Sequence, residues 1–328
     1  MKQFRQFLHL CVLWLASSAM AHALEPVSFA TDWKAQAEQG GFYQAKALGL
    51  YEKAGLGVTI RSGGPGVNIP QLLGAGAIDF GMGSNSFIPL NMVKAGVPAK
   101  AVMAAFQKDP QVLITHPRDD IQSLADMRGQ PIMVADATVN AFWAWLRVKY
   151  GFENRQIRKY TFNLAPFLVD PKAIQQGYVT SEPYTIETRG NFKPQVFLLA
   201  DYDYPSYASM VLARTDWIES KPEVVQAFVT ASIEGWRRYI YGDPTPGNQL
   251  IKQANPEMTD DIIANAISQI RAREMMRSAD TQALGLGAMT EKRWRDFFDT
   301  MSQSGVYPRD LAWQSAFTTQ FINRGDPR

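Results

Sequence analysis

Val27-Ser28-Phe29-Ala30 begins a regular alternation of short strands and helices that decides the fold of this chain. Gly40-Gly41 opens a helical stretch, Gly55 ends it, and Val58-Thr59-Ile60 is the next predicted strand. The elements that follow are predicted as helices at residues 69–75 and 87–94 and as strands at residues 78–80 and 100–106. Strands that alternate with helices of this length predict a parallel sheet with right-handed crossovers.

A second alternation follows the segment Leu124-Ala125-Asp126-Met127-Arg128-Gly129. We predict strands at residues 131–134, 157–162, 196–200 and 209–213, and helices at residues 139–150 and 171–176. The last part of the chain reads as helices only, at residues 222–241, 260–276 and 290–304. Thr259 or Asp260 and Thr290 suit the N-cap positions of the last two helices.

The two alternating sets predict an α/β protein of two lobes with a ligand cleft between them. Residues 24–115 would form the first part of lobe 1, residues 116–207 would form lobe 2, and residues 208–328 would return to lobe 1 with extra C-terminal helices. The chain would cross between the lobes near residues 112–116 and 207–214. Open parallel sheets bind ligands at the carboxyl ends of their strands, so facing lobes make a cleft that can close by hinge motion.

The N-terminal residues are typical of a cleaved signal peptide. Lys2 and Arg5 give a positive start, an apolar run covers residues 7–15, and Ala21-His22-Ala23 fits the small-x-small cleavage pattern. The apolar run is far shorter than the ~20 residues that cross a bilayer. We therefore predict a signal peptide at residues 1–23 and a periplasmic protein.

The composition excludes several classes of function. Cys11 is the only cysteine, and cleavage after Ala23 would leave His116 as the only histidine. Disulfides, thiolate catalysis and zinc sites of His and Cys are then excluded, and we expect no metal, no cofactor and no enzymatic activity. Loss of Lys2 and Arg5 would leave 31 basic residues against 31 acidic ones, so the chain lacks the bulk charge that attracts nucleic acid.

Several segments carry a resemblance to a known family. They are Thr31-Asp32-Trp33-Lys34-Ala35-Gln36-Ala37-Glu38, Gly40-Gly41-Phe42-Tyr43-Gln44-Ala45-Lys46, Leu72-Leu73-Gly74-Ala75-Gly76-Ala77-Ile78-Asp79-Phe80 and Thr180-Ser181-Glu182-Pro183-Tyr184. In this order they resemble the substrate-binding proteins that deliver pyrimidine precursors of thiamine to ABC importers, and the related sulfonate-binding proteins. The resemblance implies a type II periplasmic-binding fold and an ABC-importer permease in the inner membrane as partner.

The same superfamily includes enzymes that make the thiamine pyrimidine from pyridoxal phosphate and one of their own histidines. The histidine expected two residues before Gly41 is Gln39 in this chain, and the cysteine-rich motif of those enzymes is absent. A pyridoxal-phosphate-dependent synthase would also need a reactive lysine, for which Lys34 and Lys46 are the nearest candidates. We keep this activity as a distant alternative.

In lobe 1, five polar or aromatic side chains follow predicted strands or open helices. Trp33 offers a face for stacking on a planar ring, and the Glu38 carboxylate can accept hydrogen bonds from an amine. Ser84 and Asn85 follow a strand, and one of the residues at this position must also cap the next helix. Gln107 follows the strand at 100–106 and has an amide that both donates and accepts.

In lobe 2, Glu182 is the strongest candidate ligand contact, although an acid at a helix start is also ordinary. The others are Asp136, which follows a strand, Trp143, Asn163, Tyr184 and Tyr207. Trp143 and Trp145 lie two residues apart on one predicted helix, so only one of them would face the cleft, and we favour Trp143.

The sequence thus predicts a monomer that captures a small molecule without chemical change. The expected ligand is a planar heterocycle, a pyrimidine precursor of thiamine such as hydroxymethyl- or formylaminopyrimidine. A flavin-related compound, a sulfonate or another small organic anion is the alternative ligand for the same fold and role. Helix N-termini alone can hold an anion, so the absence of a predicted cleft arginine leaves this alternative open.

Overall fold

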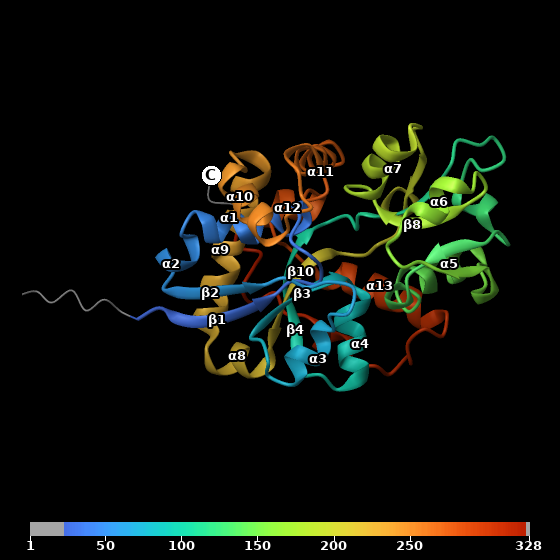
Figure 1. Ribbon diagram of the computed structural model, residues 1–328. Helices are drawn as coiled ribbons and strands as arrows, with labels where there is room; N and C mark the ends of the chain where they lie inside the picture. Colours follow the sequence, from blue (N-terminus) through green and yellow to red (C-terminus); the bar gives the residue numbers. More distant parts are fainter. Residues whose placement is uncertain (1–22, 326–328) are drawn as a thin grey trace, which may run out of the picture.

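A computed structural model describes residues 23–325, which form two five-stranded sheets with helices packed around them (Figure 1). The first sheet has the order β2 (Leu56–Arg61), β1 (Glu25–Ala30), β3 (Phe80–Asn85), β10 (Ala208–Arg214) and β4 (Ala99–Phe106). The second has the order β7 (Ile157–Lys159), β6 (Ile132–Val134), β8 (Ile174–Tyr178), β5 (Gln111–Thr115) and β9 (Gln195–Leu198). The predicted pair of α/β lobes is confirmed.

Both sheets are mixed rather than parallel throughout. β1 pairs in parallel with β2 and β3, and β6 pairs in parallel with β7 and β8, as the alternation predicts. β10 runs antiparallel to β3 and β4, and β5 runs antiparallel to β8 and β9. β10 and β5 are the strands that receive the chain directly from the other lobe, so they enter their sheets from the opposite end.

The chain passes between the lobes at residues 107–110, from β4 to β5, and at residues 199–207, from β9 to β10. The predicted lobe boundary at residue 115, and the predicted crossing at 112–116, therefore lie one strand too far along the chain. The apolar run of β5 would be buried equally well in the first or the second sheet. Its hydrophobicity alone therefore did not show which sheet it joins. Residues 171–176 were also predicted as a helix, but the second half of that stretch belongs to β8, which is almost wholly buried.

The helices of lobe 1 come from both ends of the chain. They are α1 (Gly40–Ala47), α2 (Leu50–Lys53), α3 (Ile69–Gly74), α4 (Phe87–Ala95), α8 (Thr215–Ser220), α9 (Pro222–Tyr241), α10 (Thr245–Ala254), α11 (Asp260–Ala272), α12 (Ala279–Leu284) and α13 (Glu291–Gln303). Those of lobe 2 are α5 (Phe142–Tyr150), α6 (Ala165–Val169) and α7 (Glu182–Gly190). Thr259 and Thr290 cap α11 and α13 through their hydroxyls, as predicted.

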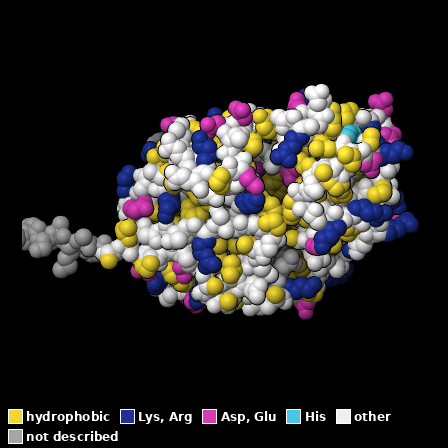
Figure 2. All heavy atoms as spheres, in the orientation of Figure 1, with side chains coloured by type: hydrophobic (Ala, Val, Ile, Leu, Met, Phe, Trp, Pro, Cys, Tyr) yellow, Lys and Arg dark blue, Asp and Glu magenta, His cyan; other side chains and the backbone are white. Residues whose placement is uncertain are grey.

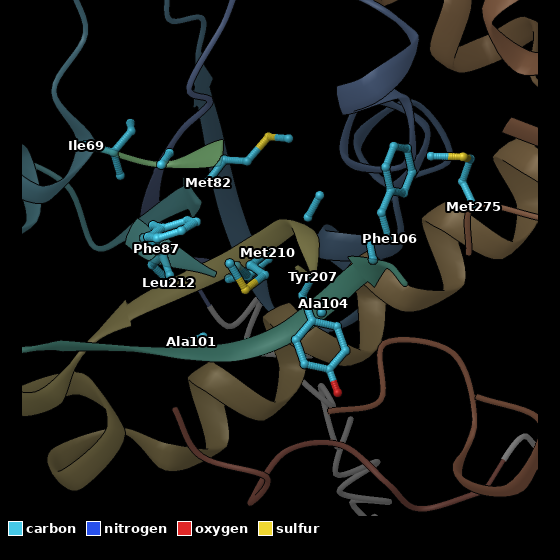
Figure 3. Packing of buried hydrophobic residues seen from close by; sticks show 14 of the residues in the cluster. Ile69, Met82, Phe87, Ala101, Ala104, Phe106, Tyr207, Met210, Leu212 and Met275 are labelled. Carbon is cyan, nitrogen blue, oxygen red and sulfur yellow. The ribbon is translucent and has the colours of Figure 1, made fainter. Parts of the chain in front are cut away.

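The Gly40-Gly41 pair serves helix packing. A Cβ atom on Gly41 would lie 2.2 Å from the ring of Trp236, and one on Gly40 would lie 2.0 Å from the ring of Tyr239. Both aromatic residues belong to α9, so the glycines allow α1 to approach that helix closely. Figure 3 shows the core beside this contact, where Phe106 of β4 lies next to Met275.

No helix between residues 23 and 325 is long and apolar enough to cross a membrane. The predicted signal peptide lies outside the described residues except for Ala23, so its cleavage stays a prediction.

Candidate ligand-binding cleft

A cavity of about 720 Å³ lies between the two lobes and is lined by both. Lobe 1 contributes the loop after β1, the 3₁₀ turn at Ala37–Gln39, residues 64–70 and the end of β3. Lobe 2 contributes the segments that follow β6, β7 and β8. The space-filling view shows hydrophobic side chains gathered in the hollow between the lobes, with basic and acidic side chains scattered around it (Figure 2).

Six of the predicted ligand contacts line this cavity. They are Trp33, Glu38, Ser84, Asn85, Asp136 and Glu182. Ser84 and Asn85 are the last two residues of β3, and the other four lie in segments that follow strands. Asn85 also accepts a hydrogen bond from Phe87 N at 3.1 Å, whereas Ser86, the N-cap residue of α4, forms no side-chain capping bond.

Gln107 and Tyr207 lie away from the cavity, in the two crossing segments. Gln107 is 2% exposed, and its amide nitrogen donates to Ala288 O at 3.0 Å. The hydroxyl of Tyr207 accepts from Thr290 N at 3.0 Å. Both side chains thus bind the segment between α12 and α13.

Trp143, Asn163 and Tyr184 are also absent from the cavity lining. Trp143 is fully buried and donates to Asn154 Oδ1 at 3.2 Å, and Trp145 is equally part of the lobe 2 core. Both tryptophans of α5 are therefore covered by protein. Asn163 accepts a hydrogen bond from Ala165 N, in the first residue of α6, at 3.0 Å. Tyr184 is half-buried on α7.

Glu38 joins the two lobes. Its carboxylate, which is 2% exposed, accepts a hydrogen bond from the hydroxyl of Thr180, which follows β8 in the opposite lobe. Burial raises the pKa of Glu38, and the Thr180 hydrogen bond opposes that rise.

Asp32 is a second acid on the lobe 1 wall, half-buried beside Glu38. Burial raises its pKa from 3.8 to about 7, and the nearby charge of Glu38 adds to the rise. Gln39 Nε2 donates to Asp32 Oδ1 at 3.5 Å and so orients this acid. Gln39 is the residue that stands where the pyrimidine-synthesising enzymes are expected to have a histidine.

Glu182 is the acid of the lobe 2 wall. Its Oε2 accepts from Tyr178 N at 2.8 Å, and Tyr160 OH donates to Oε1 at 3.4 Å. Burial raises the pKa of Glu182 from 4.5 to about 7. The carboxylate thus supports the start of α7 and also lines the cavity, so the structural and ligand-binding interpretations are compatible.

Aromatic side chains from the two lobes meet at the cavity. The ring of Trp33 lies 4.5 Å from that of Phe162, and Phe162 lies 5.1 Å from Tyr160 (centroid to centroid). Phe162 is 40% exposed and has a φ of 62°, which is a strained conformation for a bulky residue.

Other residues of the lining were not predicted. They include Asp32, Gln111, Lys159, Tyr160, Phe162, Gln176 and Tyr178. Asp32 could have been found from its position next to Trp33. Lys159 Nζ lies 2.9 Å from Asp136 Oδ2, so the one lysine of the lining forms an ion pair.

No group of three or more His, Cys, Asp or Glu residues in the described part of the chain could hold a metal ion. The lysines considered for a pyridoxal phosphate adduct do not line the cavity. Lys34 pairs with Glu257 at 2.8 Å, and Lys46 Nζ donates to Val58 O at 2.6 Å.

Comparisons with known proteins agree with this architecture. The chain is similar to the riboflavin-binding protein RibY of Chloroflexus aurantiacus, with 25% identity over 237 residues. The match covers 70% of this chain and 66% of that protein, which is slightly less than two thirds of the relative's length. It matches the fold of the periplasmic aliphatic sulphonate binding protein SsuA of Escherichia coli with a TM-score of 0.68 at 16% identity, covering 90% of this chain and 92% of that chain. A Candida albicans protein with the generic periplasmic binding protein fold matches with a TM-score of 0.62 at 12% identity, covering 91% and 98%.

The likeness to these solved structures confirms the predicted periplasmic-binding fold. The NMT1/THI5 like family matches residues 36–245, which is more than half of the chain. The chain therefore belongs to the NMT1/THI5-like family.

Proposed function

We propose that this protein captures a small planar nitrogen heterocycle in the cleft, without chemical change, and delivers it to an ABC permease in the inner membrane. The observation that carries the proposal is the cavity itself, in which Trp33 lies among three carboxyl groups, those of Asp32, Glu38 and Glu182. An aromatic face binds a flat ring, and carboxylates accept hydrogen bonds from its N–H groups.

The leading ligand is a pyrimidine precursor of thiamine. An aminopyrimidine presents an exocyclic amine beside a ring nitrogen that can carry a proton, and a carboxylate can accept from both. Glu182 and Glu38 lie on opposite walls, so a ring between them would be held from two sides. Hydroxymethyl- and formylaminopyrimidine have this pattern of donors.

Riboflavin is the second candidate, and two observations favour it. The cavity of about 720 Å³ falls within the range of about 300–1,000 Å³ of sites for drug-sized ligands, and a single pyrimidine ring is much smaller. The similar protein from Chloroflexus aurantiacus is named a riboflavin-binding protein. The ring N–H and the ribityl hydroxyls of riboflavin would donate to the same carboxylates.

A sulfonate or another small anion fits the charges of the lining less well. Four acidic residues line the cavity, and Lys159 is paired with one of them, Asp136. An anion placed beside Asp32 and Glu182 would be repelled unless both were protonated.

The first experiment is thermal unfolding of the chain from Leu24 onward with hydroxymethylpyrimidine, formylaminopyrimidine, thiamine, riboflavin and an alkanesulfonate. A ligand at about a hundred times its dissociation constant adds roughly 2.7 kcal/mol of stability, which raises Tm by several degrees. A shift with a pyrimidine or with riboflavin selects between the two candidates. A shift with the sulfonate alone contradicts the proposed ligand class, and visible absorbance with a mass increase on adding pyridoxal phosphate would instead support the synthase.

We also propose that the protein works as a periplasmic monomer after cleavage following Ala23. N-terminal sequencing of exported protein should begin at Leu24, and light scattering should give the mass of one chain. An intact N-terminus on exported protein contradicts the predicted cleavage.

A further inference from the structure

The two segments that connect the lobes are both held by the C-terminal helices. In the first segment, Gln107 N and Lys108 N donate to Met275 O at 2.7 and 3.1 Å. Lys108 Nζ donates to Arg273 O at 2.9 Å. In Figure 1, α13 lies near the junction between the two lobes.

Arg293 of α13 binds both segments with one guanidinium group. Its Nη2 donates to Gln107 O of the first segment at 2.5 Å. The same nitrogen donates to Ser206 O of the second segment at 3.1 Å, and Nε donates to Pro205 O at 3.1 Å. The guanidinium carbon lies 3.9 Å from the ring centroid of Tyr207, so the cation also stacks on the second segment.

The guanidinium group of Arg293 binds backbone carbonyl groups of these segments instead of a carboxylate. Among residues 23–325, no carboxylate oxygen forms a salt bridge with it, whereas Arg295, two residues further along α13, pairs with Glu291 at 2.5 Å. A guanidinium presents five N–H donors in a rigid plane, which fixes the relative positions of the carbonyl groups that it binds. Arg293 therefore holds the two crossing segments in one geometry.

The clamped residues lie next to the cleft lining in both segments. Pro110 and Gln111 line the cavity shortly after Gln107, and Ala208 and Ser209 line it directly after the second clamped stretch. A change in the spacing of the segments would thus move both walls of the cleft.

We propose that Arg293 is a positioning residue that couples the two interlobe segments. It thereby sets how far the lobes open and how narrow the distribution of interlobe distances is. The pivot then lies on the lobe 2 side of the clamp, at residues 109–110 and 199–204. This inference concerns the hinge and does not depend on which ligand the cleft binds.

The test measures interlobe distances in the ligand-free protein. The chain from Leu24 onward has no cysteine, so Gln71→Cys in lobe 1 and Val169→Cys in lobe 2 provide unique sites for spin labels. Both positions are exposed. Arg293→Met and Arg293→Lys are compared with Arg295→Met, which removes an exposed arginine from the same helix.

We expect Arg293→Met to increase the fraction of molecules outside the wild-type distance range by about fivefold or more, as loss of a coupling between two elements predicts. Arg293→Lys should give a smaller increase, because an ammonium group cannot keep the planar geometry. Arg295→Met should leave the distances unchanged.

A merely stabilising role for Arg293 gives a different result. Arg293→Met would then lower Tm while the distance distribution stays that of the wild type, and this outcome overturns the proposal. If Arg293→Met does not fold by circular dichroism, Arg293→Lys decides the question, and an unchanged distribution in that variant overturns the proposal equally.

Discussion

The indole of Trp33 and the phenyl ring of Phe162 come from opposite lobes and lie 4.5 Å apart at an interplanar angle of 51°. At this separation no third ring fits between them. Phe162 therefore covers one face of Trp33, and a planar ligand must use the other face or displace Phe162. The left-handed backbone of Phe162 makes displacement easier, because leaving φ of 62° relieves strain.

Phe162→Gly and Phe162→Ala separate the ring from the strain. Both remove the phenyl group, but only glycine adopts a positive φ without penalty. We expect the glycine variant to be more stable than the alanine variant by about 1 kcal/mol, measured by urea unfolding. Equal stability of the two variants would show that the backbone strain is not significant.

Trp33→Ala should weaken binding of a planar ligand by about tenfold or more, since it removes both aromatic stacking and buried area. Trp33→Phe keeps a smaller aromatic face and should retain part of the affinity. Isothermal titration calorimetry with the ligand found in the thermal panel measures both. Unchanged affinity of Trp33→Ala would remove Trp33 from the site.

Glu182→Gln should weaken binding of an amine-bearing ligand by roughly tenfold or more, because a charge-assisted hydrogen bond becomes a neutral one. The amide oxygen can still accept from Tyr178 N, so the fold should persist. Glu187→Gln, an exposed substitution on the same helix, is the matched control. If both variants bind like the wild type, Glu182 serves only the start of α7.

Thr180→Val tests the hydrogen bond that joins the lobes. The change keeps the shape of the side chain but leaves the buried Glu38 carboxylate without its cross-lobe donor. We expect a loss of about 1–3 kcal/mol in the free energy of unfolding. Thr188→Val, on the exposed face of α7, should have a much smaller effect in the same urea titration. Similar losses in both variants would contradict a role for the cross-lobe bond.

The sequence predicted those site residues that depend on parallel strands. Trp33 and Asp136 follow the carboxyl ends of β1 and β6, where open sheets place their ligands. Gln111 lies at the amino end of β5, which faces the cleft only because β5 is antiparallel. Strand direction depends on long-range pairing, which local alternation does not contain.

The errors elsewhere have the same origin. Gln175 and Gln176 are ordinary helix formers, yet both are buried in β8 at the centre of the second sheet. Gln176 reaches the cavity for that reason. Trp143 was expected at the cleft because it and Trp145 cannot share one face of a helix, but the lobe 2 core surrounds both side chains.

The buried acids make stability depend on pH. The pKa values of Asp32, Asp109 and Glu182 are raised to about 7 in the folded protein by burial. The folded state then binds more protons than the unfolded state between about pH 4 and pH 7, so these groups make the free energy of unfolding fall as pH rises through that range. Urea unfolding across this range measures the slope. A free energy of unfolding that rises across the whole range would contradict the raised pKa values.

Because the same acids titrate near neutral pH, the pH dependence of ligand affinity distinguishes the two classes of ligand. A heterocycle that donates to Asp32 and Glu182 and keeps its own number of protons on binding, as riboflavin does, needs both carboxyl groups ionised. Its affinity should increase from about pH 5 to pH 8 and its binding should release protons, whereas a pyrimidine whose ring nitrogen takes up a proton on binding should release fewer. An anionic ligand needs the protonated forms, so its affinity should fall over the same range and binding should take up protons. Calorimetry in buffers of different ionisation enthalpy gives the sign of the proton transfer. Because Glu182→Gln removes one of the titrating groups, proton release should decrease in that variant, whereas Glu187→Gln should leave it unchanged.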